Sequence, residues 1–392
     1  MVVKKNHFIF FLLSLLFLTP NFYYYSYGIA RLTDFTTILI MALYLIFNLN
    51  NIKINKQIYK YLVVSYLFFV SILISLLLAS ANQKITFKDF VDLIRPLTVI
   101  ISILFGICIS KQGFNKNKIS NFIIFLGLIA GSVSILEKIG LDIFYKLYSD
   151  ANHALYNRTS SIYYDFAEFG IMQLISVSIC IERYINLKAK KYIFYILFIL
   201  IGIIFSTSKA SILLFFIFTS MVVLFNYKII FFKFKNLIYF IVVICILAFG
   251  ILLYINYGDI KLISGFQAIY NLDNSDASVG NRTQQIETIL PLIFSFDLNT
   301  LFGYTSFREF EHSYIEVAFF SNLFRFGIIG TFLYYLSFLL IIFEKNLNFL
   351  IKSLVISACA IDLVAAMTNR FSFPILMFIL IGILLTNRRN EI

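Results

Sequence analysis

The chain has 392 residues, of which 60% are hydrophobic, 18% are aromatic and only 13% are charged. About a quarter of the residues in soluble domains are charged, so this composition excludes a soluble globular protein and indicates an integral membrane protein. The net charge of +12 does not require a nucleic-acid partner, because an excess of basic residues is also typical of cytoplasmic membrane connections.

Twelve apolar segments, each about as long as a bilayer-spanning helix, follow one another along the chain. They cover residues 8–27, 32–50, 61–80, 94–110, 119–136, 162–181, 192–206, 210–227, 237–256, 322–343, 350–367 and 371–386. The sequence therefore predicts an all-α polytopic membrane protein with about 12 transmembrane helices in a single domain, residues 1–392.

The first of these segments has two interpretations. Lys4 and Lys5 precede the apolar run Phe8–Leu18, which is the pattern of a signal peptide. No small-residue cleavage site follows, however, and the apolar, Tyr-rich character continues as far as Tyr27. We therefore expect a first membrane anchor.

The distribution of basic residues predicts the orientation, because Lys and Arg near the ends of spans are retained in the cytoplasm. Alternate connections, together with the two termini, contain 19 of the 32 basic residues and only three of the 20 acidic residues. Both termini are therefore predicted to be cytoplasmic. Two loops are predicted on the outer side, a smaller one over residues 137–161 and a large one over residues 257–321.

Several common catalytic motifs are absent from the sequence. There is no GxxxxGKS phosphate loop, no HExxH, no Cys/His ligand spacing and no Gly-x-Ser-x-Gly, and the cytoplasmic connections are too short to form a nucleotide-binding domain. We therefore expect no nucleotide substrate, no cofactor and no bound metal.

The first candidate site is an outer turn at Lys209, which is the only charged residue between Lys191 and Lys228. A lysine at this depth can simply extend its ammonium group to the lipid headgroups. In the alternative interpretation, Ser206 and Ser208 hold the ammonium group ready for a lipid-borne anion, because a base in such a position is a functional hypothesis by default.

The second candidate site is the end of the smaller outer loop and the start of the next span. Arg158 precedes Tyr163 and Tyr164, and Asp165 and Glu168 are three residues apart on one helix face. One interpretation is a structural ion-pair network. The other is that Arg158 binds a phosphate group and the two tyrosines offer platforms for a sugar.

The third candidate site is the polar stretch of residues 257–313, which contains seven acidic residues, three basic residues and His312. Arg282 lies in a predicted helix, and the fixed donors of a guanidinium group match two oxygens of a pyrophosphate. His312 can take a proton near neutral pH, with Glu311 beside it. A lone loop histidine is more often incidental, so catalysis by this pair is a hypothesis.

The order of these motifs resembles the O-antigen polymerase and ligase superfamily of bacterial surface-polysaccharide enzymes, over about residues 150–335. That family has a Ser-x-Ser-Arg turn, then an outer loop with an Arg-led helix, a Leu-Phe-Gly-x-Gly turn, a His-Asn pair and a Gly-x-x-Gly motif. The matching segments here are Ser206–Lys209, Arg282, Leu301–Tyr304, His312–Ser313 and Gly327–Gly330, with Arg158 and Gly170 similar to the pattern of the preceding outer loop.

Three positions depart from the family pattern. Lys209 replaces an arginine, Tyr304 is not followed by a second glycine, and Ser313 replaces an asparagine. A lysine keeps the positive charge but loses the bidentate geometry of an arginine.

The resemblance, which is to the polymerase branch, implies a GT-C-like glycosyltransferase of the bacterial inner membrane, with its large loop in the periplasm. The donor would be a growing O-antigen or capsule glycan on undecaprenyl pyrophosphate, and the acceptor would be a second lipid-linked repeat unit. Membrane lipids and a chain-length regulator protein are the other implied partners.

The resemblance also implies roles for individual residues. His312 or Glu311 would remove the proton from the attacking sugar hydroxyl, and the basic residues would stabilise the departing pyrophosphate. The residues expected to bind the pyrophosphate and the glycan are Arg282, Lys209, Arg158, Ser208, Tyr163 and Tyr164.

Two other functions remain open. An O-antigen ligase would transfer the same glycan to the lipid A core. A lipid-linked oligosaccharide flippase also has about twelve spans, but it needs charges deep in a central cavity. In this sequence only Asp362 is expected deep within a span, away from both of its ends.

Overall fold

The computed structural model of the chain is helical throughout the part that it describes, apart from one antiparallel pair of two-residue strands, β1 (Ser26–Tyr27) and β2 (Ala30–Arg31). The described residues are 2–19, 26–27, 30–48, 50, 52, 54–82, 87–141, 159, 161–163, 166–206, 208–233, 277–295, 297–305, 317–344, 347–363, 368 and 371–386.

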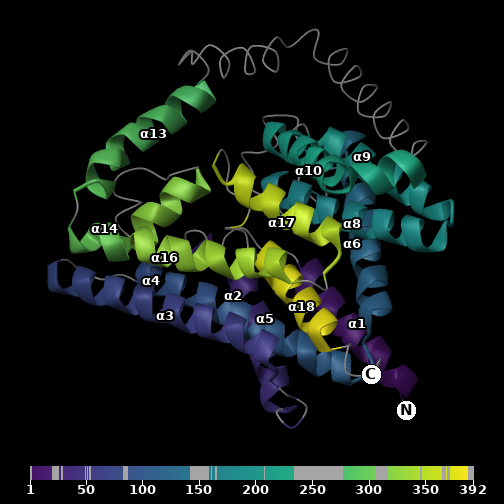
Figure 1. Cartoon of the computed structure of the whole chain (residues 1–392), viewed down its shortest axis with the longest axis horizontal. Helices are drawn as coiled ribbons and strands as arrows, with labels where there is room; N and C mark the ends of the chain where they lie inside the picture. The colour runs from purple at the N-terminus through teal and green to yellow at the C-terminus, as the bar shows by residue number, and fades with distance from the viewer. Residues whose placement is uncertain are drawn as a thin grey trace.

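The described helices follow the apolar runs of the sequence (Figure 1). In the first part of the chain they are α1 (Val2–Leu18), α2 (Leu32–Ile46), α3 (Lys56–Asn82), α4 (Phe87–Phe90), the 3-10 turn η3 (Val91–Leu93), α5 (Ile94–Lys111), α6 (Lys116–Lys138), α8 (Phe166–Leu187), α9 (Lys191–Phe205) and α10 (Lys209–Lys233). In the second part they are α13 (Ala277–Ile293), α14 (Leu298–Phe302), α16 (Ala318–Phe343), α17 (Phe349–Ile361) and α18 (Ser372–Thr386).

Eleven of the twelve predicted spans overlap one of these helices, and the twelfth, residues 237–256, lies outside the described residues. Four described helices are long and apolar enough to cross a membrane, namely Lys56–Ala81, Val91–Lys111, Lys116–Lys138 and Ala318–Phe343. The all-α class and the membrane-length helices are thereby confirmed, and they indicate a membrane protein. The count of twelve crossings, the domain bounds and the two outer loops stay predictions.

The closest helix packing joins α5 and α18, which lie side by side in Figure 1. A Cβ atom on Gly106 of α5 would overlap the carbonyl oxygen of Ile379, and one on Gly382 of α18 would overlap the carbonyl oxygen of Ile103. Small residues allow two backbones to approach this closely, and such contacts are a main source of stability between membrane helices. This pair therefore forms a rigid centre, with nearly all of α18 buried.

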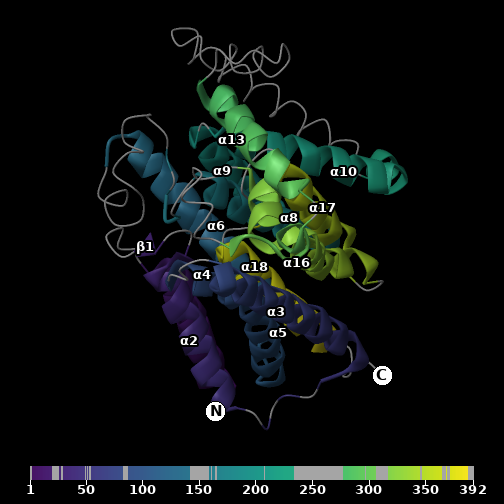
Figure 2. The same cartoon turned by 90° about the vertical axis from the view of Figure 1, so that its left-hand side faces the viewer.

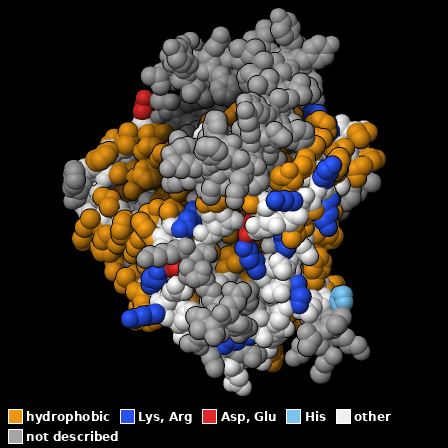
Figure 3. Space-filling model, turned by 45° about the vertical axis from the view of Figure 1, so that its right-hand side comes forward, with side chains coloured by type: hydrophobic (Ala, Val, Ile, Leu, Met, Phe, Trp, Pro, Cys, Tyr) orange, Lys and Arg blue, Asp and Glu red, His pale blue; other side chains and the backbone are white. Residues whose placement is uncertain are grey.

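Two ion pairs join helices at the ends that carry the predicted cytoplasmic lysines. The Nζ atom of Lys60 on α3 lies 2.8 Å from a carboxylate oxygen of Glu344, which follows α16, and Lys116 of α6 pairs with Glu182 of α8. Both carboxylates are buried. They are two of the few acidic residues in the lysine-rich connections, and their pairing explains how they are accommodated there. Lys and Arg also account for most of the charged side chains on the face drawn in Figure 3, between broad hydrophobic areas.

At the opposite end of α3 and α16, the described part of the long polar stretch folds onto the membrane helices. The predicted helix around Arg282 is confirmed as α13, which extends away from α3 and α5 (Figure 2). Ile289 and Ile293 of α13 form a small apolar cluster with Tyr304 and with Phe324 of α16. The rings of Tyr304 and Phe324 are stacked, with 5.1 Å between their centroids.

Two glycines bring the end of α14 against an interruption of α16. Gly327 breaks the helix with a φ of 66°, and Gly303 ends α14 with a φ of 97°. A Cβ atom on Gly303 would overlap the carbonyl group of Arg325, and one on Gly327 would overlap the carbonyl group of Leu301. The Ser75 hydroxyl of α3 donates to the carbonyl oxygen of Gly303 at 3.2 Å. The two glycine motifs of the second half of the chain therefore meet in space.

This contact predicts that Gly303→Ala destabilises the protein more than Gly140→Ala. Both glycines have a φ of 97°, but a Cβ atom on Gly140 would have no neighbour within 4 Å. A positive φ strains both variants, at a cost of roughly 1–3 kcal/mol each, and overpacking adds about 1–3 kcal/mol at Gly303 alone. Denaturant titration of the purified protein in detergent measures the difference. Equal losses in the two variants would contradict the backbone contact.

Candidate functional site

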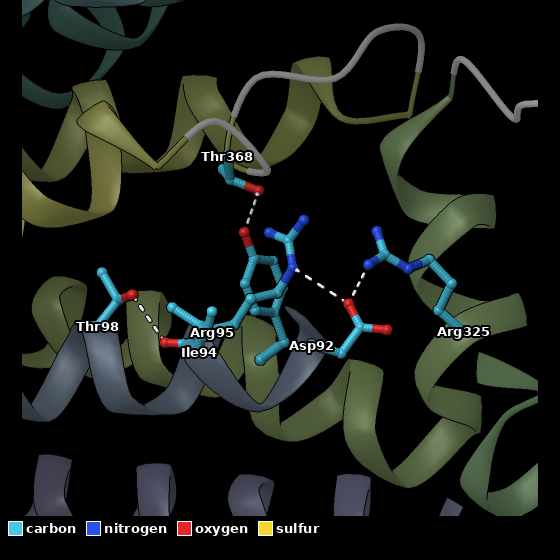
Figure 4. Close-up of polar contacts among 7 residues, drawn as sticks. Asp92, Ile94, Arg95, Thr98, Arg325 and Thr368 are labelled. Carbon is cyan, nitrogen blue, oxygen red and sulfur yellow. Dashed lines mark hydrogen bonds and ion pairs between the residues drawn. The ribbon is translucent and has the colours of Figure 1, made fainter. Parts of the chain in front are cut away.

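Three charged side chains meet between α16, η3 and the start of α5 (Figure 4). Arg325 of α16 donates to a carboxylate oxygen of Asp92, and the Nε atom of Arg95 lies 3.8 Å from the same oxygen. The exposed fractions are 1% for Arg325, 2% for Asp92 and 5% for Arg95. Two guanidinium groups therefore share one buried carboxylate.

Aromatic rings form the apolar wall of the cluster. The guanidinium of Arg325 lies 5.3 Å from the ring centroid of Phe326, and that of Arg95 lies 5.9 Å from the same ring and 5.3 Å from the ring of Phe371. A guanidinium group near an aromatic ring gains cation–π attraction, which grows as water is excluded. The rings therefore hold both cations where bulk solvent does not screen them.

The cluster lies at the helix ends opposite to the two lysine ion pairs. Sixteen residues separate Arg95 from Lys111, and eighteen separate Arg325 from Phe343. At 1.5 Å per residue these stretches are about 24 and 27 Å long, which is close to the thickness of a bilayer core, about 30 Å. If the lysine-rich ends are cytoplasmic, the cluster is at the outer boundary of the membrane.

Local sequence explains how the cluster forms. Asp92 and Arg95 are three residues apart, so both side chains lie on one face of the turn that leads into α5. Pro96 fits in the first turn of α5 because the N–H groups there have no partner within the helix. Arg325 comes from the last turn before the break at Gly327, so its direction depends on the contact between α14 and α16.

A second carboxylate, Asp362, organises the hydroxyl groups next to this cluster. It accepts hydrogen bonds from the Tyr335 hydroxyl at 3.0 Å and from both the N–H and the hydroxyl of Thr368. Tyr334 in turn donates to the Thr368 hydroxyl at 3.1 Å. Asp362 is the C-terminal cap of α17, which ends at Ile361, so Asp362 follows this helix and does not lie within it. Its depth in the membrane stays a prediction.

The first two candidate sites of the sequence analysis are neighbours in the fold. A Cβ atom on Gly170 of α8 would overlap the side chain of Ser211 of α10. Ser208 is buried, and its hydroxyl accepts the N–H of Ser211, while the Ser206 hydroxyl donates to the Ile203 carbonyl group. These two hydroxyls cap the ends of α9 and α10, and a role of Ser208 in substrate binding stays a prediction.

The second candidate site borders a small polar cavity between α1, α2, α8 and α18. Tyr163 and Glu168 line it together with Asp34, and Ser372 donates to Glu168. The volume is about 30 Å³, which is room for about two water molecules. Tyr163 is buried against Phe169. The cavity is therefore too small for a sugar ring, and the sugar-binding role of Tyr163 stays a prediction.

The structure describes only some of the predicted site residues. The side chains of Ser208 and Tyr163 are described. Lys209 and Arg282 are placed by their backbone, at the start of α10 and in α13. The remaining four, Arg158, Tyr164, Glu311 and His312, lie outside the described residues.

Sequence reasoning did not select Asp92, Arg95 and Arg325, although signals for them were present. An acid and a base at i,i+3 before an apolar run, and an arginine eight residues into the apolar helix Ala318–Phe343, are unusual in membrane segments. Ionisable residues in such positions are functional candidates by default. Their mutual contact is not visible in the sequence.

Comparison with known proteins found no match to any family model, to any curated protein or to any solved structure.

Asp92 and Arg325 are predicted to be energetically coupled. Asp92→Asn and Arg325→Gln should each cost up to about 3–5 kcal/mol, because each removes one member of a buried ion pair. The double variant should recover about 0.5–3 kcal/mol of the summed losses. Unfolding free energies of the three variants in detergent measure this coupling.

The matched control is Arg183→Gln. Arg183 donates to the Asn117 carbonyl oxygen at the surface, so its loss should cost no more than about 0.5 kcal/mol. Strictly additive losses at Asp92 and Arg325 would show that the two side chains do not form a stabilising pair.

Proposed function

We propose that the protein is a membrane glycosyltransferase that polymerises lipid-linked repeat units of a bacterial surface polysaccharide. The donor is a glycan on undecaprenyl pyrophosphate, and the acceptor is a repeat unit on a second such lipid. The reaction takes place at the periplasmic face of the inner membrane, where Arg325, Asp92 and Arg95 would lie if the predicted orientation is correct.

The proposed reaction is a displacement at the anomeric carbon of the donor glycan. The bond from this carbon to the pyrophosphate oxygen breaks, and a bond forms to a hydroxyl oxygen of the acceptor sugar. His312 or Glu311 takes the hydroxyl proton. The pyrophosphate-lipid leaves with the bonding electron pair, and Arg282, Lys209 and Arg158 stabilise its negative charge.

The observation that best supports the proposal is the buried cluster of Asp92, Arg95 and Arg325, which brings two guanidinium groups close together. The α14 turn, which is part of the long polar stretch, packs against α16 beside Arg325. A phosphate-bearing lipid at the outer boundary is a ligand that guanidinium groups bind well. In the proposed site, Arg282 approaches the pyrophosphate from the polar stretch and the buried arginines supply the field beneath it.

The positions of the buried charges favour an enzyme over a flippase. Every buried charged side chain among the described residues lies within two turns of a helix end, in a connection or beside the break in α16. These residues are Asp34, Asp89, Asp92, Arg95, Glu137, Glu168, Glu182, Arg325, Glu344 and Asp362. A transport path for a charged lipid headgroup needs polar groups near the middle of the membrane. The described charges instead gather at the two faces.

Deletion of the gene is predicted to leave surface glycan as single repeat units, while transfer of these units across the membrane continues. The length profile of the glycan and the state of the lipid carrier measure this. A ligase deletion would instead leave long glycan chains on the carrier, and a flippase deletion would leave repeat units on its cytoplasmic side. Normal long chains on the cell surface would refute all three functions.

Complementation of the deletion with Arg282→Ala is predicted to restore no chain extension at a normal protein level, because the leaving pyrophosphate loses a charged, bidentate donor. Arg183→Ala is the matched control, since Arg183 lies at the predicted cytoplasmic end of α8 and should restore full chain length. Full activity of Arg282→Ala would remove this residue from the proposed pyrophosphate site.

A further inference from the structure

The last residues of α13, the turn that follows and α14 form a bend against the break in α16. We call residues 291–295 and 297–302 the outer elbow. Three large apolar side chains of the outer elbow are exposed, Phe294 at 61%, Leu298 at 59% and Leu301 at 41%. A group of apolar side chains in water is unfavourable and usually marks an interaction surface. A large loop in water, as the sequence predicts, does not explain why these three apolar side chains are exposed.

The polar groups of the outer elbow are directed to its own backbone. Asp297 accepts the Thr300 N–H at 2.8 Å and also contacts the hydroxyls of Thr300 and Tyr304. Partial burial opposes ionisation, but these hydrogen bonds outweigh it and lower the pKa of Asp297. A charged cap beside outward-facing apolar side chains is the amphipathic pattern of a segment that lies in a membrane surface.

Two helices independently give the depth of the outer elbow, both measured from the ion pair of Lys60 and Glu344. Along α3, fifteen residues separate Lys60 from Ser75, which donates to the Gly303 carbonyl oxygen, and this distance is about 22 Å. Along α16, seventeen residues separate Glu344 from Gly327, which is about 25 Å. Both values are smaller than the thickness of a bilayer core, about 30 Å.

The outer elbow lies at the same depth as an exposed leucine of α3. Leu77 of α3 is 69% exposed and lies two residues beyond Ser75, on a helix long and apolar enough to cross the membrane. α14 packs on the end of α3 and on α16. Its exposed leucines therefore lie at the same depth as Leu77, which α3 exposes to the bilayer. Acyl chains can therefore cover both.

We propose that the outer elbow is embedded in the outer leaflet of the membrane, with Phe294, Leu298 and Leu301 in contact with phospholipid acyl chains. Its partner is thus the lipid bilayer, and the elbow attaches the end of α13 to the membrane surface close to the buried arginines. This inference concerns the position of the segment and holds whether or not the protein transfers glycans.

The sequence allows a direct test, because the chain contains no tryptophan. Leu298→Trp and Leu301→Trp each give a single fluorophore in the full-length protein, reconstituted into phosphatidylcholine vesicles with or without brominated acyl chains. Leu77→Trp is the reference for a residue in lipid. Thr288→Trp, at an exposed polar position of α13, is the reference for a residue in water.

Brominated lipids should quench Leu298→Trp and Leu301→Trp at least about twofold and as strongly as Leu77→Trp, which corresponds to burial about 5–10 Å into the headgroup and acyl boundary. Acrylamide in the aqueous phase should quench mainly Thr288→Trp. The proposal is wrong if both elbow variants respond to acrylamide as Thr288→Trp does. It is equally wrong if neither quencher affects them, since a second protein surface would then cover the elbow. Two elbow positions are used so that a folding defect in one variant leaves the other to decide.

Discussion

An arginine buried between membrane helices keeps its charge at every physiological pH, so its position depends on a carboxylate within reach. Asp92 is that carboxylate for Arg325, and it joins α16 to the start of α5. The break at Gly327 follows Arg325 by two residues, and the end of α14 rests on that break. The arrangement of the outer side of the described structure therefore depends on this one ion pair, with Arg95 as a second cation on the same oxygen.

The helices were largely predictable, because a backbone in lipid must satisfy its own hydrogen bonds and an apolar run of sufficient length has almost no alternative to a helix. The ends and interruptions of the helices could not be predicted from the sequence. The run 350–367 is apolar almost throughout, yet α17 ends at Ile361, where Asp362 binds Thr368 instead of continuing the helix. Gly327 is similar, since its backbone conformation is set by the contact with Leu301 of another segment. Tertiary contacts of this kind cannot be recognised from the hydrophobic periodicity of the local sequence.

The sequence predicted the regions that contribute to the candidate site, but it did not predict the individual residues. Charges and hydroxyls near the outer ends of spans drew attention to residues 158–170, 206–210 and 257–313, and the described parts of the first two regions are in contact. The sequence analysis did not select Arg95 and Arg325, because arginines near span ends often only extend to lipid headgroups. Their different role comes from burial against Asp92, over a sequence separation of 233 residues. A single sequence does not reveal a pairing of that kind.

The same separation has a consequence for biosynthesis. Ribosomes add roughly 5–20 residues per second, so about 12–47 s pass between the synthesis of Asp92 and that of Arg325. During this interval α5 is already available for insertion, and an unpaired carboxylate at its start would raise the cost of entering the bilayer. Arg95, three residues away, is made at almost the same moment and neutralises Asp92 until α16 arrives. We therefore expect Arg95 to assist the insertion of α5 before Arg325 completes the cluster.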